Sequence, residues 1–187
     1  RHWDGCIVQA MKSIRAGAIG EVYRVVVHMG GYTEPRDWWR SLKSVSGGIL
    51  FDWGVHLIEY TLQAINAGIV EVSGFAHNGY WAPKVAWKKD ANEDEAMAII
   101  RFDNGAWAIV CLSELDRDHK RPWLEITGTE GSYAMEHGTY AITTTKNGER
   151  ITRSGKNVPD DWQRYYRHIA EHLTQGKALI ITPEWAR

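Results

Sequence analysis

The chain has 187 residues, of which 44% are hydrophobic and 24% charged, and its formal net charge is -1. A nearly neutral chain lacks the basic excess that binds a phosphate backbone, so nucleic acid is not an expected partner. No apolar run approaches the roughly 20 residues of a membrane-spanning helix, and no membrane association is expected.

The first part of the chain predicts two helices around one strand. Apolar residues at helical spacing predict a helix over residues 5–16, and alternating valines predict a strand over 21–29. A polar loop follows over 30–46. A long and mostly apolar helix is predicted over 49–67, and Gly68 is expected to end it.

The second part of the chain predicts a run of strands and then one more helix. The expected strands, joined by turns rich in Gly and Asn, are 69–77, 95–102, 106–114, 123–128, 132–136, 139–145 and 149–153. A last helix is expected from about 160 to 176, with its apolar stripe (Trp162, Tyr166, Ile169 and Leu173) buried. This order favours an α+β fold over a single domain of residues 1–187: a large, mostly antiparallel sheet with helices packed on one face, in two layers.

One segment at the start of the long helix carries residues suited to acid–base chemistry. Gly47 and Gly48 precede the helix, and Asp52 and His56 follow with a spacing that brings two side chains onto one helical face. A carboxylate beside an imidazole orients it and raises its basicity, so the pair can exchange protons near neutral pH. The glycines would let a substrate approach closely. On spacing alone, the solvated stripe of a surface helix is the more common explanation.

The same segment resembles the Gly-Gly-(Gly)-x-x-x-Asp-x-Gly-x-His motif of the glucose-fructose oxidoreductase / inositol dehydrogenase / MocA (Gfo/Idh/MocA) family. Ser46 stands where many members have a third glycine. Further similar segments follow in the family's order along almost the whole chain: Arg1-His2-Trp3-Asp4, the segment from Gly17 to Val22, Trp39-Arg40, the segment from Ile126 to Ser132, and the end from Gly176 to Glu184.

The resemblance implies the C-terminal domain of a NAD(P)-dependent oxidoreductase that acts on a sugar, inositol or similar polyol by hydride transfer at a secondary alcohol or ketone. It implies that His56 is the acid/base and that Asp52 orients it and binds a neighbouring hydroxyl. NAD or NADP would be bound by an N-terminal Rossmann domain, whose lysine completes the site. The chain starts at Arg1 and has no Gly-x-Gly-x-x-Gly fingerprint, so we expect a fragment without a Rossmann domain, without bound cofactor or metal, and inactive alone.

Other residues are weaker candidates for the pocket. Arg36 and Trp39, with Trp38, lie in the loop before the glycines and could line the pocket or pack the loop down. His28 falls on the polar side of its strand and could point toward a pocket. Ten tryptophans exceed what a core of this size requires, which weakly favours a carbohydrate ligand because sugar rings stack on indole faces.

Two alternatives stay open beside the dehydrogenase. One is a non-catalytic ligand-binding or dimerisation module of the same fold, and the other is a NAD-dependent glycosidase. A homodimer is expected through the open sheet face, where Trp107, Ile109 and Cys111 share one side of a strand. Cys6 and Cys111 are expected to be free thiols in a reducing compartment, so the cytoplasm is the expected location.

The last helix contains His168-x-x-Glu171-His172, which matches an inverted zinc-protease pattern. The two histidines fall beside the predicted buried stripe, and few residues remain that could supply a third ligand. We therefore expect these residues to lie at the surface and to hold no metal.

Overall fold

The computed structural model describes residues 1–186. Its centre is one open sheet of eight strands in the order β2-β3-β4-β1-β5-β6-β7-β8. The strands are β1 (Val22–Gly30), β2 (Ile69–His77), β3 (Glu95–Phe102), β4 (Trp107–Ser113), β5 (Leu124–Gly128), β6 (Gly131–Met135), β7 (Thr139–Lys146) and β8 (Glu149–Lys156). Each predicted strand is confirmed, with ends that differ by at most three residues.

The sheet is antiparallel except where β1 pairs with β4 in parallel. β1 comes early in the chain but lies in the middle of the sheet, because the hairpins of β2–β4 and β5–β8 extend from its two edges. The α+β fold class is therefore confirmed.

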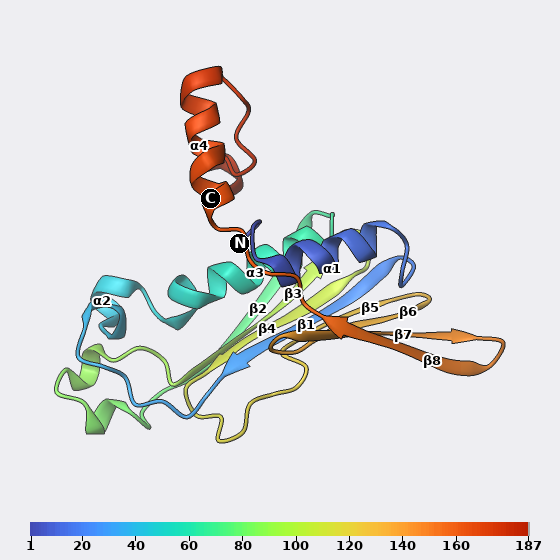
Figure 1. Cartoon of the computed structure of the whole chain (residues 1–187). Helices are drawn as coiled ribbons and strands as arrows, with labels where there is room; N and C mark the ends of the chain where they lie inside the picture. The colour runs from blue at the N-terminus through green and yellow to red at the C-terminus, as the bar shows by residue number, and fades with distance from the viewer. Residues whose placement is uncertain (187) are drawn as a thin grey trace.

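Two helices cover one face of this sheet, α1 (Gly5–Arg15) and α3 (Val55–Ala64) (Figure 1). Alternation along the strands sorts the side chains between the faces. Val27 in β1 and Ala108 and Val110 in β4 are fully buried beneath the helices, whereas Trp107 and Ile109 point to the other face and stay partly exposed. The core is a single layer between the helices and the sheet.

The start of the long helix differs from a regular α-helix. Residues Leu50–Gly54 form a π-helical turn before α3 begins at Val55. Four short helical segments lie in the loops on either side: Trp39–Ser41, Lys43–Ser46 (α2), Ala82–Lys84 and Lys88–Asp90. A π-turn inserted into a helix is rare and often marks a functional site.

The last long helix, α4 (Gln163–Gln175), departs from the expectation that it buries its apolar stripe. It projects away from the sheet and helices (Figure 1). Trp162, Tyr166 and Leu173 are 57%, 71% and 77% exposed. The periodicity showed correctly that one face of the helix is apolar, but it carries no information on what covers that face. A short helix, α5 (Pro183–Ala186), brings the chain back toward α3.

None of the helices formed by residues 1–186 has the length and apolar character needed to cross a membrane.

Both cysteines are free thiols, as expected. Burial raises the pKa of Cys6 to about 11 and that of Cys111 to about 12, and nearby carboxylates raise both further. Thiols with such pKa values are poor nucleophiles at neutral pH, because little thiolate is present.

Candidate functional site

Asp52 lies in the π-turn and pairs with Arg40. The Arg40 Nη1 atom is 3.0 Å from Asp52 Oδ1 and 3.4 Å from Oδ2. The guanidinium of Arg40 also lies 5.2 Å from the ring centroid of Trp38 and 5.1 Å from that of Trp39. The two indoles and the carboxylate therefore hold Arg40 in place, and Arg40 fixes the orientation of Asp52.

His56 lies four residues further along the chain, in the first turn of α3. Its ring meets the ring of Trp53 edge-to-face at 5.4 Å, and the guanidinium of Arg1 lies 5.1 Å from the same indole. Burial lowers the pKa of His56, and the positive charge of Arg1 lowers it further, while Asp4 and Asp52 raise it by less. Asp52 thus raises the basicity of His56, as expected, but burial and Arg1 outweigh its effect, so the net shift of the pKa is downward.

Nor do Asp52 and His56 form a hydrogen bond to each other in the part of the chain that the structure describes. The π-turn explains why. Its hydrogen bonds span five residues rather than four, so a spacing of four falls short of a full turn there. Asp52 turns to Arg40 instead, and His56 is left as a neutral base beside Trp53.

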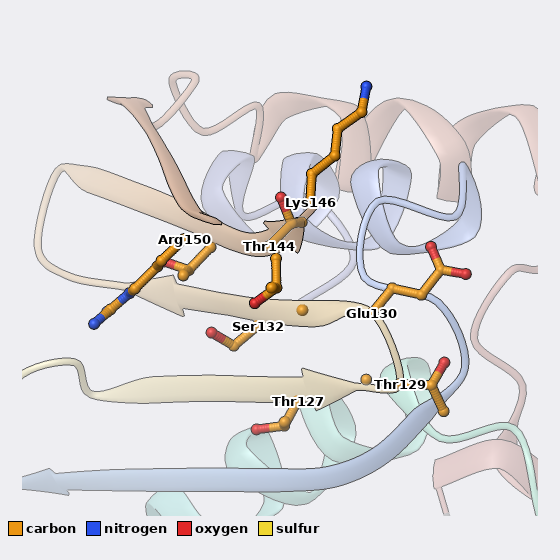
Figure 2. Close-up of a pocket in the computed structure, with 11 residues that line it drawn as sticks. Thr127, Thr129, Glu130, Ser132, Thr144, Lys146 and Arg150 are labelled. Carbon is orange, nitrogen blue, oxygen red and sulfur yellow. The ribbon is translucent and has the colours of Figure 1, made fainter. Parts of the chain in front are cut away.

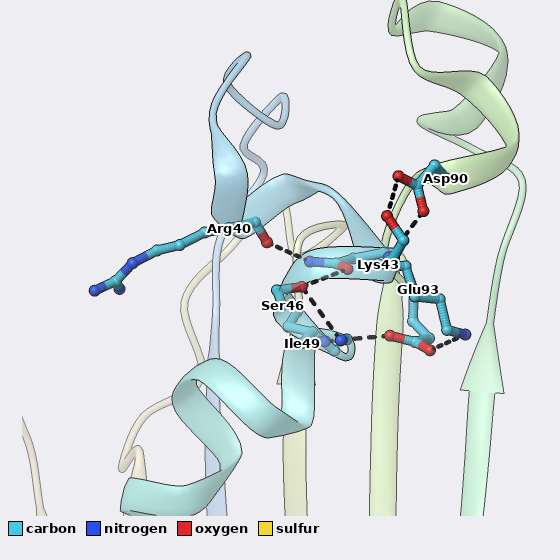
Figure 3. A network of polar contacts seen from close by, with 9 residues as sticks. Arg40, Lys43, Ser46, Ile49, Asp90 and Glu93 are labelled. Atoms are coloured by element: carbon cyan, nitrogen blue, oxygen red, sulfur yellow. Dashed lines mark hydrogen bonds and ion pairs between the residues drawn. The ribbon is translucent and has the colours of Figure 1, made fainter.

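The paired glycines close a loop against Glu93. Gly47 and Gly48 have φ angles of +83° and +118°, which residues other than glycine rarely adopt. The Ile49 N–H donates to Glu93 Oε2 at 3.2 Å, and Lys43 Nζ lies 2.5 Å from Glu93 Oε1 (Figure 3). Glu93 thus occupies the start of the helix, the place where a substrate was expected to approach. That the glycines contact substrate stays a prediction.

A cavity of about 590 Å³ opens beside Asp52, at the ends of β1 and β4. Its lining combines two aromatic side chains with polar groups from four separate segments, among them Thr33, Trp38, Arg40, Asp52, Trp53, Asn92, Glu114 and His119. Such a mixture of stacking surface and convergent hydrogen-bonding groups is typical of a pocket for a small polar molecule.

Of the expected catalytic residues and glycines only Asp52 lines this cavity; His56, Gly47 and Gly48 are not part of its lining, and three further pocket candidates lie elsewhere. Arg36 is exposed and does not line this cavity, and Trp39 stacks on Arg40 without lining it. His28 lies on the open face of the sheet, where its Nε2 atom is 2.5 Å from Asp116 Oδ2. Their assignment to the substrate stays a prediction, while their neighbours Trp38 and Arg40 line the cavity.

Glu114 and His119 were missed because they come from a loop without a recognisable motif. Glu114 follows β4 directly, and the expected strand 106–114 ended on it. His119 reaches back toward β1, where its Nδ1 atom donates a hydrogen bond to the Gly30 carbonyl at 2.7 Å. Only the tertiary structure brings this loop to the end of β1.

A second hollow lies over β5 to β8 and is lined mostly by hydroxyls. Thr127 and Ser132 extend from neighbouring strands, whereas the side chain of Lys146 points away from them (Figure 2). Its polar groups do not converge on one point, so this hollow is a weaker candidate than the cavity beside Asp52.

The zinc-like motif in α4 holds the chain end instead of a metal. The Ile180 N–H donates to His168 Nε2 at 2.9 Å, Lys177 Nζ lies 3.0 Å from Glu171 Oε2, and His172 Nδ1 donates to the Lys177 carbonyl at 2.6 Å. Each of the three motif residues thus binds the segment that returns along the helix. Among residues 1–186 no cluster of three potential metal ligands occurs.

The described residues do not form a dinucleotide-binding loop. Such a loop joins a strand to a helix, whose N-terminus binds the pyrophosphate. The glycine-containing turn between Gly128 and Gly131 joins strands β5 and β6 instead. This turn therefore does not provide the helix N-terminus that binds the pyrophosphate in such a loop.

Sequence comparisons identify relatives over nearly the whole chain. The family model described as the GFO/IDH/MocA C-terminal domain matches residues 7–134. The scyllo-inositol 2-dehydrogenase (NAD(+)) of Bacillus subtilis is 26% identical over 97% of this chain and 53% of its own length. The scyllo-inositol 2-dehydrogenase (NADP(+)) IolW of the same organism is 21% identical over 98% of this chain and 56% of its own. The chain spans about half the length of these curated relatives.

Solved structures share the fold. The oxidoreductase yvaA of Bacillus subtilis superposes with a TM-score of 0.81 at 19% identity, over 99% of this chain and 57% of that one. The aldose-aldose oxidoreductase of Caulobacter crescentus, solved with glycerol, gives a TM-score of 0.76 at 20% identity, over 99% and 55%.

Proposed function

The chain belongs to the Gfo/Idh/MocA family and corresponds to the C-terminal domain of its members, and we propose a function from this assignment. We propose that the chain is the substrate-binding half of a NAD(P)-dependent dehydrogenase that acts on inositol or a related polyol. The reaction would be hydride transfer at a secondary alcohol or ketone. The observation that carries the proposal is the cavity beside Asp52, which combines an arginine-bound carboxylate with indole surfaces. Both curated relatives are named for the oxidation of scyllo-inositol.

His56 supports the acid–base part of this proposal. Because burial and Arg1 lower its pKa, the imidazole is neutral at pH 7 and can accept the proton of an alcohol. Asp52 is an ionised acceptor whose remaining lone pairs can bind a neighbouring hydroxyl, and Arg40 keeps it in position. A nicotinamide bound elsewhere in the protein would take up the hydride.

We propose that a cofactor-binding part covers α4. The exposed stripe of Trp162, Tyr166 and Leu173 is too apolar to remain in water without a partner. Arg1 contacts Trp53 and lines a hollow with Trp162 and Tyr166, so a domain that precedes Arg1 would emerge between α4 and His56. From there it could reach both surfaces.

The proposal is tested on the full-length protein with NAD+ or NADP+ and scyllo-inositol. We expect oxidation of the polyol with stoichiometric formation of NAD(P)H, and a drop in kcat of about 10²- to 10⁴-fold in H56Q, since the general base is lost. The matched control is H137Q, whose side chain is exposed in the turn between β6 and β7.

The outcomes separate the alternatives. Turnover in the wild type that survives in H56Q would remove His56 from the mechanism but keep the enzyme. Inositol binding without turnover with either cofactor would favour a non-catalytic ligand-binding module.

A further inference from the structure

Glu114 lies on the face of the sheet that carries the Asp52 cavity. It follows β4, two positions after Leu112, whose side chain is buried beneath the helices. Because alternate residues share a face, the side chain of Glu114 is directed to the same side as Leu112. Both residues line the cavity.

The carboxyl of Glu114 has neither a hydrogen bond nor an ion pair within residues 1–186. The neighbouring carboxylates are engaged: Asp52 pairs with Arg40, and Asp94 accepts the N–H groups of Tyr80 and Trp81 at 2.7 and 3.0 Å. Burial raises the pKa of Glu114 to about 7, and the negative charge of Asp94 adds to it. A half-buried carboxyl that lacks a hydrogen-bonding partner costs free energy, so a ligand that supplies this partner would be bound more tightly.

We propose that Glu114 is a substrate-binding residue whose carboxyl forms a hydrogen bond to a hydroxyl of the polyol, an inference that rests on the function proposed above. A protonated carboxyl both donates and accepts, as a hydroxyl does, so the two groups match. Asp52 remains an acceptor. Two carboxyl groups beside an arginine that is already paired favour a neutral polyol over a sugar acid, because the carboxylate of a sugar acid would find no free cation in the described lining.

The other charged groups around the cavity are held by partners of their own. Arg40 and Asp52 neutralise each other across the π-turn, Asp94 lies before β3, and His119 binds the Gly30 carbonyl from the loop after β4. A pH effect on substrate binding that disappears in a Glu114 variant is therefore assigned to Glu114 itself.

The test compares wild type, E114Q and E114L in the full-length protein, with scyllo-inositol as the probe between pH 5.5 and 9. We expect the wild-type KM to rise several-fold as pH passes about 7, because ionisation removes the donor. In E114Q the KM should not follow this rise, since the amide donates at every pH. In E114L it should be about 10-fold higher throughout, with kcat changed by less than about 3-fold. E149L, at the exposed first residue of β8, is the control.

Parallel KM profiles in wild type, E114Q and E114L would overturn the inference while leaving the dehydrogenase intact. If the wild type does not oxidise inositol, the proposed function fails separately, and calorimetric titration of scyllo-inositol into the cofactor-loaded protein then decides. Binding that E114L weakens about 10-fold upholds the role of Glu114. Equal binding, or no binding to any variant, refutes it.

Discussion

At the scale of single residues, the site is organised by partners that lie outside the recognisable motif. Asp52 is held by Arg40 rather than by His56, and the helix start is occupied by Glu93 rather than left free for a ligand. The motif therefore combines two tasks. Asp52 and His56 are the residues that we propose for the chemistry, while Gly47 and Gly48 let the chain turn around the half-buried carboxylate of Glu93.

Substitution of Gly48 tests this separation. In G48A the new Cβ would lie 2.6 Å from Glu93 Oε2 at a φ of +118°, so strain and a disturbed hydrogen bond add together. We expect the free energy of unfolding to fall by about 2 to 3 kcal/mol, measured by urea denaturation. G79A is the control, because Gly79 has a φ of +100° but no atom within 4 Å of the added Cβ, and about 1 kcal/mol is expected there. Equal losses would mean that Glu93 tolerates the methyl group.

At the scale of elements, α3 and α4 have similar lengths but different surroundings. α3 buries Leu57 and Tyr60 against the sheet, whereas none of the residues of α4 is buried. The short return segment bound by His168, Glu171 and His172 covers a different side of α4 from its apolar stripe. The stability of α4 therefore depends on a surface that the sheet does not provide.

Hydrogen exchange should show this dependence. In the isolated chain we expect the amides of α4 to exchange much faster than those of α3, because a helix with little buried area opens locally at low cost. In the full-length protein α4 should gain protection, since the proposed cofactor-binding part covers it. Protection of α4 equal to that of α3 in the isolated chain would contradict this prediction.

At the scale of the whole molecule, the open sheet face divides into two halves. Over β3, β4 and β1 it carries Ile99, Ile109 and Val26 in register, whereas over β6 to β8 Ser132, Thr143 and Thr152 follow one another. We propose that a homodimer, if it uses this face, buries the apolar half, because only that half would gain from leaving water.

The prediction is that I109D converts the dimer to a monomer in light scattering coupled to size exclusion, while T143D on the polar half does not. An introduced carboxylate at the centre of an apolar interface would be desolvated without a partner. Unchanged thermal unfolding of I109D is the check that the variant remains folded. A dimer that survives I109D but is lost in T143D would place the interface on the other half.

The sequence by itself determined the elements and the order in which they follow. Alternation and helical spacing are local properties, and they located eight strands, α1, α3 and α4 to within a few residues. The cavity could not be predicted in the same way. Glu114 and His119 are far from Asp52 in the sequence and line the same cavity only because β1 and β4 lie side by side.

The same limit explains where the structure departs from the expectations. The basicity of His56 depends on how deeply its ring is buried and on Arg1, which lies far away in sequence, and neither is a property of the local spacing. The π-turn that separates Asp52 from His56 arises where the helix start is packed on the sheet, and the apolar stripe of α4 was visible in the sequence while its surroundings were not. Local patterns determine which surfaces a chain needs to bury; only the tertiary structure decides what each surface meets.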